Sequence, residues 1–266
     1  MTRTFLALLH FDGRDFIGWQ RQAAGRSVQG EVEQALGRLA AQPVAAVAAG
    51  RTDAGVHAEG LGVSFAMPTR WEAHGVRRGL NALLPADCWA AEVHEMAPEF
   101  HARKSALTRS YRYLVGTDDA AASPFRRPFE WALQRPLDLA LLQDAAGVIR
   151  GEHAFAAFSV RGQEKPHHRC RLVQAEWRAR NGLGVEFRVE ADRFLHHMVR
   201  MLVGTMVEIA LGRRPPEDMP RLLAGRDNQE TSAPAPPEGL YFVRATYPAS
   251  AYRAPAKELH ETLRGQ

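Results

Sequence analysis

The chain has 266 residues, enough for one large domain or two modest ones, and 45% of them are hydrophobic, as is usual for a globular protein. Lysine and arginine outnumber aspartate and glutamate by 34 to 30, so the position of the cations matters more than the net charge of +4. Two cysteines exclude a disulfide framework and a four-thiolate zinc site, and with no signal peptide and no apolar run long enough for a membrane we expect a cytoplasmic protein.

The first part of the sequence predicts short strands alternating with two helices. Residues 4–10 predict a strand, and Ser27 is a favourable N-cap for a helix whose apolar residues share one face. A buried strand, a second strand, a helix and a third strand are then expected over residues 44–49, 61–66, 73–84 and 89–96.

The second part repeats this order of elements. Tyr111 lies on one face of an alternating strand, Asp138 caps the next helix, and Asn181–Gly182 predicts a hairpin. The expected elements that follow are a long apolar-striped helix, a short helix and a last strand, over residues 194–211, 217–223 and 240–247. We expect two related α+β halves, 1–105 and 106–248, and a tail, 249–266.

The predicted strand 44–49 ends in a glycine-punctuated turn that carries chemistry. Gly50 and Gly55 allow the backbone to turn tightly and to approach a ligand closely. Arg51 lies two residues before Asp53, and a nearby arginine favours the ionised carboxylate. An ionised Asp53 suits a nucleophile or a base. The alternative is an Asx-type turn in which Arg51 is only a surface charge.

Residues 51–57, Arg-Thr-Asp-Ala-Gly-Val-His, resemble the active-site signature of the tRNA pseudouridine synthase A family. The similarity runs from about residue 5 to residue 247. Other segments that match in order are 16–22, 100–104, 111–113, 194–200 and 238–241. The resemblance implies an α+β pseudouridine synthase fold, in which two RRM-like halves with antiparallel sheets flank a central cleft.

The same resemblance implies an isomerase that converts uridine to pseudouridine at positions 38, 39 and 40 of the tRNA anticodon stem-loop. Such an enzyme works as a homodimer, flips the target base out of its stack, and needs no metal or organic cofactor. The implied roles are a nucleophile for Asp53, a base-stacking ring for Tyr111 and a wall of the base pocket for Leu240. Arg200 would pair with Asp53, Arg51 would fill the gap left by the base or hold a phosphate, and the phosphate contacts would be Arg21, Arg103 and Lys104.

The residues alone leave other interpretations open. Tyr111 and Leu240 could be ordinary core residues, and Arg200 could lie on a solvated helix face. The chain could be a non-catalytic RNA-binding protein that uses the same residues. It could also be an N-glycosidase that releases the base. A dispensable Asp53 would favour the first alternative, and free uracil would indicate the second.

The sequence also contains two pairs of adjacent histidines, His167–His168 and His196–His197. His196–His197 lies in the predicted helix 194–211, where adjacent side chains point about 100° apart, so we expect no metal site there. Residues 162–169 are basic and contain His167–His168, whereas members of the family often carry a Cys-Gln-Ser-like loop nearby. This departure leaves the RNA contacts of that loop open.

Overall fold

The structure is a computed structural model that describes residues 1–160, 167–225 and 228–253. The chain divides into two compact units. The first contains residues 1–52, 58–107 and the segment that begins at Arg244, and the second contains 53–57 and 108–243. The turn that begins at Asp53 therefore belongs to the second unit. Among the described residues, no helix is both long and apolar enough to cross a membrane.

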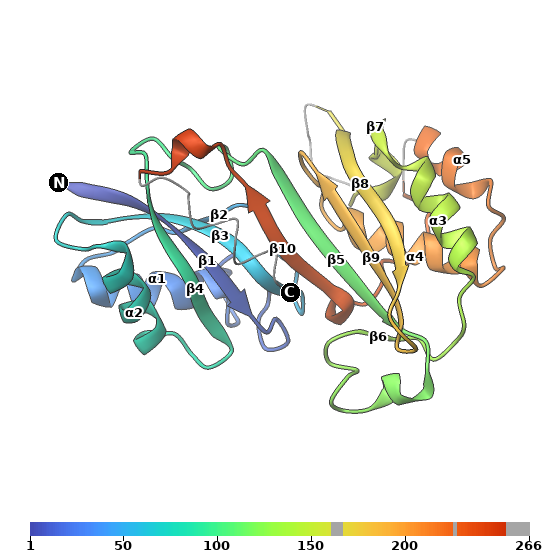
Figure 1. Cartoon of the computed structure of the whole chain (residues 1–266), viewed down its shortest axis with the longest axis horizontal. Helices are drawn as coiled ribbons and strands as arrows, with labels where there is room; N and C mark the ends of the chain where they lie inside the picture. The colour runs from blue at the N-terminus through green and yellow to red at the C-terminus, as the bar shows by residue number, and fades with distance from the viewer. Residues whose placement is uncertain (161–166, 226–227, 254–266) are drawn as a thin grey trace. The chain divides into compact units, whose positions relative to one another are not determined.

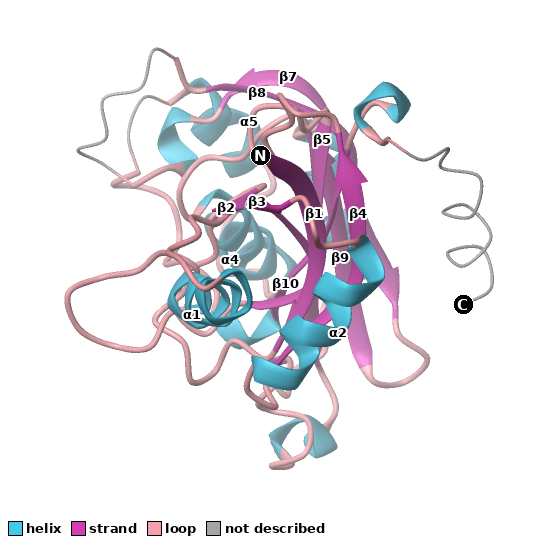
Figure 2. Ribbon diagram, turned by 90° about the vertical axis from the view of Figure 1, so that its left-hand side faces the viewer, coloured by secondary structure: helices cyan, strands magenta, loops and turns pink. Residues whose placement is uncertain are grey.

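The first unit is built on an antiparallel sheet in which β1 pairs with β3 on one side and β4 on the other. The short strand β2 adds to β3. Helix α1 packs beside α2, and α2 packs against β4 (Figure 1, Figure 2). In chain order these elements are β1 (Thr2–Phe11), α1 (Val28–Ala40), β2 (Val47–Ala48), β3 (His57–Pro68), α2 (Ala73–Leu83) and β4 (Cys88–Met96).

The second unit is also α+β. Strand β9 pairs antiparallel with β5 and with β8, and β8 pairs antiparallel with β7. Helix α3 packs against β8 and α4, and α5 packs against β7 (Figure 1). The elements are β5 (Thr108–Gly116), β6 (Trp131–Ala132), α3 (Leu139–Val148), β7 (Gly151–Ala154), β8 (Arg169–Ala179), β9 (Gly184–Ala191), α4 (Met198–Ala210) and α5 (Asp218–Ala224). Strand β10 (Leu240–Thr246) begins in this unit and ends in the first.

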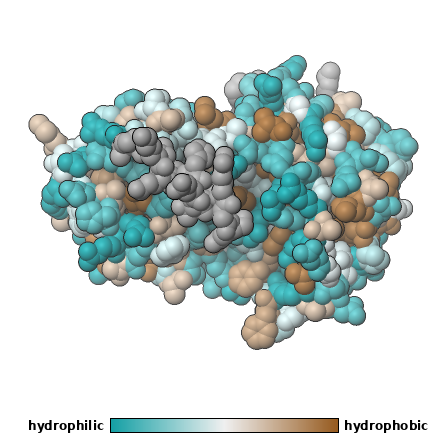
Figure 3. All heavy atoms as spheres, in the orientation of Figure 1, coloured by the Kyte–Doolittle hydropathy of each residue, from teal (hydrophilic) through white to brown (hydrophobic). Residues whose placement is uncertain are grey.

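Each unit has an apolar core between its helices and its sheet. Phe5 and Leu36 are completely buried in the first unit. In the second, Trp177 stacks at a tilt on Phe187, with ring centroids 5.0 Å apart, and its indole N–H points to the sulfur of Met206 in α4. The face in Figure 3 is mostly hydrophilic, with separate apolar residues among the polar ones. The predicted α+β class is confirmed.

Local capping and turn signals agree with the structure. The hydroxyl of Ser27 accepts a hydrogen bond from the Gly30 amide at the start of α1. The carboxylate of Asp138 accepts from Ala140 and Leu141 at the start of α3. Asn181 and Gly182 both have positive φ, as a hairpin turn between β8 and β9 requires.

Two expected elements are wrong in extent. The predicted strand 44–49 is reduced to β2, in which Val47 and Ala48 pair with β3. The amide and the carbonyl of Ala46 bond to the side chains of Glu33 and Gln29 instead. The predicted helix 194–211 begins only at Met198, because His197 adopts a left-handed conformation with φ of 62°. A left-handed residue cannot continue a right-handed α-helix. His196 and His197 therefore precede the helix. The loop 162–169 is the segment expected to differ from the family, and its residues 162–166 lie outside the described part of the chain.

Candidate active site

The turn after Asp53 is fixed by backbone geometry and by an aromatic stack. The Val56 amide donates to the Asp53 carbonyl, and Gly55 has a φ of 78°. A Cβ on Gly55 would lie 3.0 Å from a carbon of Pro237, so glycine suits both the conformation and the space. The buried ring of His57 stacks on Tyr241 at 4.8 Å, with its Nε2 3.2 Å from the Pro128 carbonyl. The backbone that carries Asp53 is therefore anchored on both sides of Gly55.

Arg200 lies in the first turn of α4 and is held by the backbone of a neighbouring loop. Its Nε donates to the Ala235 carbonyl at 2.6 Å, and the Ala235 amide donates to the Arg200 carbonyl at 2.9 Å. Gly204, one turn further, allows this close approach, because a Cβ there would lie 2.3 Å from the Ala233 carbonyl oxygen. The guanidinium NH1 then lies 3.4 Å from Oδ2 of Asp53.

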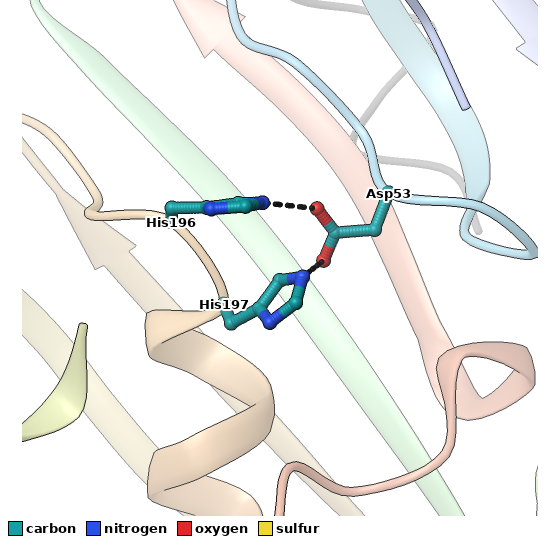
Figure 4. A group of neighbouring side chains, drawn as sticks. All are labelled: Asp53, His196 and His197. Carbon is teal, nitrogen blue, oxygen red and sulfur yellow. Dashed lines mark ion pairs between the residues drawn. The ribbon is translucent and has the colours of Figure 1, made fainter. Parts of the chain in front are cut away.

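Two imidazoles complete the surroundings of the Asp53 carboxylate (Figure 4). Nε2 of His196 lies 3.5 Å from Oδ1, and Nε2 of His197 lies 3.4 Å from Oδ2. The left-handed conformation of His197 turns both side chains toward the carboxylate as the chain enters α4. Burial lowers the pKa of His197 below its usual range, although the charge of Asp53 acts in the opposite direction. The Asp53 side chain remains 20% exposed.

Tyr111 presents an aromatic ring from β5 in the same unit. It is 9% exposed, and its ring meets the rings of Phe194 and Phe242 edge-on, with centroids 4.9 and 5.0 Å away. Burial raises the pKa of Tyr111, and the charge of Asp53 raises it further. The phenol therefore stays protonated at neutral pH. This site combines a partly exposed carboxylate, a fixed cation, two imidazoles and a tyrosine, which suits nucleophilic or general-base chemistry.

Comparison with known proteins gives this carboxylate a context. A family model described as tRNA pseudouridine synthase matches residues 145–248. The tRNA pseudouridine synthase A of Moorella thermoacetica is 42% identical over 241 residues, covering 90% of this chain and 97% of that protein. The chain belongs to the tRNA pseudouridine synthase A family. The proteins of the same name from Thermus thermophilus and Chlorobium limicola are 41% and 39% identical, over 92% and 90% of this chain and 97% of each of those proteins.

Membership of the pseudouridine synthases makes the chain an isomerase, as its signature sequence predicts. Within this synthase the structure brings three of the predicted site residues together in the second unit, namely Asp53, Tyr111 and Arg200. Leu240 is buried at the start of β10, also in that unit. Arg51 is exposed and belongs to the first unit.

The residues of the synthase that are predicted to bind phosphates also belong to the first unit. Arg21 is exposed and forms an ion pair with Glu33 of α1, with its NH1 3.4 Å from the carboxylate. Arg103 and Lys104 are exposed in the segment after β4, where their backbone amides donate to Nδ1 of His101. All three cationic side chains are accessible to solvent.

Sequence reasoning missed the two histidines as partners of Asp53. Their expected divergence assumed that both lie in a helix, and this premise is wrong because α4 begins at Met198. The sequence signal for them is the segment 194–200, which matches the family and contains both histidines. His196 and His197 therefore join the site as residues that touch the carboxylate.

Proposed function

We propose that this pseudouridine synthase isomerises uridine at positions 38, 39 and 40 of the tRNA anticodon stem-loop, with Asp53 as the nucleophile. The observation that carries the proposal is the Asp53 carboxylate itself. It lies in the family signature, is partly exposed, and has Arg200 at 3.4 Å. Carboxylates of this kind can form covalent intermediates with sugars.

The proposed reaction exchanges one glycosidic bond for another. Asp53 assists cleavage of the bond between N1 of uracil and C1′ of the ribose, either by attack on C1′ or through an elimination intermediate. The freed uracil rotates, and its C5 forms the new bond to C1′. N1 takes up a proton and the proton of C5 passes to water, so substrate and product are isomers. The balance requires no oxidant, reductant or energy source, and we propose that no cofactor takes part.

The other residues position the two reacting fragments. Tyr111 stacks on the target base, and a base–aromatic contact of this kind contributes about 1–3 kcal/mol. Leu240 forms a wall of the base pocket, which restricts where the uracil can rotate. Arg200 holds the carboxylate in place, because its own Nε is fixed by the Ala235 carbonyl. His196 and His197 limit the directions in which the carboxylate can turn.

Binding of the anticodon stem-loop is proposed to involve base flipping. The target uridine is stacked, and its extrusion costs a few kcal/mol. Arg51 fills the vacated space or holds the adjacent phosphate, and Arg21, Arg103 and Lys104 bind phosphates without reading sequence. We also propose a homodimer, and a location in the cytoplasm where tRNA is found.

Tritium release from uracil C5 tests this function. Three tRNA transcripts labelled at C5 would each keep a single uridine at position 38, 39 or 40, with cytidine at the other two positions. We expect tritium release from these three substrates and no cleavage of the RNA chain. A control transcript with cytidine at positions 38, 39 and 40 should release no tritium. Free uracil among the products would indicate an N-glycosidase. Tight tRNA binding without release would indicate a non-catalytic RNA-binding protein.

A further inference from the structure

The atoms around Asp53 also form a set of metal ligands. Oδ1 and Oδ2 of the carboxylate face the Nε2 atoms of His196 and His197 at 3.5 and 3.4 Å (Figure 4). One ligand atom from each of the three side chains lies within 4.8 Å of the other two. The two imidazole rings are 4.1 Å apart, tilted by 48°, and their Nε2 atoms both point toward the carboxylate.

The separations between the carboxylate and each imidazole are close to those between the ligands of a small transition-metal ion. Zinc binds histidine nitrogen at about 2.0–2.1 Å and carboxylate oxygen at about 2.0–2.2 Å. Tetrahedral ligands at such distances are about 3.3 Å from one another. The separations of 3.5 and 3.4 Å between the carboxylate and the two imidazoles are close to this value, and they involve one carboxylate oxygen each. The imidazoles of His196 and His197 are 40% and 28% exposed, and the proposed site requires their rotation to bring both nitrogens onto one ion.

We propose that Asp53, His196 and His197 bind a divalent transition-metal ion such as Zn²⁺, and that the bound ion reversibly blocks the synthase. Two imidazole nitrogens and one carboxylate are a donor set that zinc, cobalt, nickel and copper accept, whereas magnesium and calcium prefer oxygen ligands. The three side chains leave a tetrahedral metal one open position for water or an added ligand.

Arg200 distinguishes this site from a resident metal centre. Its guanidinium lies 3.4 Å from Oδ2 of Asp53 and is fixed by the Ala235 carbonyl, so it repels an arriving cation. Substitution of Arg200 should therefore strengthen metal binding, which loss of a structural residue would not do. This opposition makes the ion an inhibitor that competes with Arg200 for the carboxylate.

The inhibition rests on the proposed role of Asp53, whereas metal binding does not. A metal bound to the carboxylate withholds its electron pairs from the ribose, and it occupies the space next to the target base. The ion is not consumed and no bond of the protein is broken. A chelator should restore the full rate.

Cobalt substitution gives a direct readout on the intact protein. Titration with Co²⁺ should produce visible absorption of a coordinated ion at one site per chain, and competition with Zn²⁺ should remove it. We expect the affinity to fall at least tenfold in H196A and in H197A, and to rise at least tenfold in R200Q. H74A is the matched control, since His74 is an exposed histidine 3.5 Å from the Glu72 carboxylate, and its affinity should equal that of the wild type.

Other outcomes separate the two proposals. Unchanged affinity in H196A and H197A, or weaker binding in R200Q, would overturn the metal site whatever the enzyme does. If Zn²⁺ binds with the expected pattern but tritium release continues at the same rate at saturation, the inhibitory role is wrong. A protein that binds the metal as expected but releases no tritium even with chelator would contradict the proposed function and leave the metal site intact.

Discussion

Two carboxylates in the second unit differ in how closely basic side chains contact them. The side chain of Glu130 is 3% exposed and is held at 2.7 Å by Arg126 and at 2.6 Å by Arg180. Asp53 is 20% exposed, and its three basic neighbours lie at 3.4 to 3.5 Å. The carboxylate oxygens of Glu130 therefore form short ion pairs, whereas the contacts of the Asp53 oxygens are long. We call Glu130 with Arg126 and Arg180 the closed cluster, and Asp53 with its three basic neighbours the open site. We infer that the closed cluster stabilises the fold and that the open site is available for chemistry.

The closed cluster extends beyond Glu130. Arg126 also forms an ion pair with Asp118 at 2.7 Å and donates to the Leu183 carbonyl, so it joins the segment after β5 to the hairpin between β8 and β9. At the open site, by contrast, the short hydrogen bond of Arg200 runs from its Nε to the Ala235 carbonyl. The same residue types therefore fix a loop in one place and leave a reactive group accessible in the other.

Asp53→Asn tests the open site and should have the largest effect. The amide cannot act as a nucleophile, so we expect tritium release to fall by about 10⁴-fold or more. Asparagine has nearly the same shape, and the free energy of unfolding should change by less than about 1 kcal/mol. Asp144→Asn, at an exposed position of α3, is the control and should retain the wild-type rate.

Glu130→Gln tests the closed cluster, and its effect should be on stability. Loss of the buried charge leaves Arg126 and Arg180 without their shared partner, which should cost about 3 kcal/mol of unfolding free energy in urea denaturation. Glu152→Gln removes one partner of an exposed pair with Arg169 and should cost less than about 1 kcal/mol. Equal losses in the two variants would contradict the structural role of Glu130.

Arg200→Gln should reduce kcat by about 10²-fold, because the carboxylate loses the group that orients it. The affinity for tRNA should change much less than kcat, which separates positioning of Asp53 from RNA binding. Arg213, in the turn after α4, pairs with Glu208 and is exposed, so Arg213→Gln is the matched control with an unchanged rate. A fall in tRNA affinity alone would exclude the positioning role.

The smallest effect concerns the pH dependence of the closed cluster. The hydrogen bonds from Arg126 lower the pKa of Asp118 below its usual range. Its stabilising contribution is therefore present above the pKa of an unfolded aspartate and is lost as the pH falls through the lowered value. Unfolding curves should show Asp118→Asn less stable than the wild type at pH 7, with a difference that disappears on acidification. A difference that persists in strong acid would show that the carboxylate charge is not its cause.

Sequence patterns predicted the features that depend on local chemistry. Ser27 and Asp138 cap their helices, and Asn181–Gly182 forms its hairpin, because each signal acts within a few residues. The start of α4 was misjudged because His197 takes a left-handed conformation beside Asp53, about 140 residues earlier in the chain. An apolar stripe records the buried face of a helix but not the residue at which it begins.

The residues of the candidate site that lie in recognisable sequence motifs could be predicted from the sequence. Asp53 stands out in its glycine-rich turn, and the resemblance of residues 194–200 to the family pointed to Arg200 as its partner. The closed cluster around Glu130 gave no comparable signal, because Arg180 reaches it from a position 50 residues away. Contacts of this length are set by the tertiary fold.

The most direct test of the difference between the two carboxylates compares D53N and E130Q in one experiment. Tritium release from labelled tRNA and urea unfolding would be measured on both variants and on the wild type. The structure predicts that D53N remains as stable as the wild type and releases no tritium, while E130Q unfolds more easily but turns over normally wherever it is folded. Wild-type release by D53N, or a folded but inactive E130Q, would contradict the assignment of chemistry to the open site.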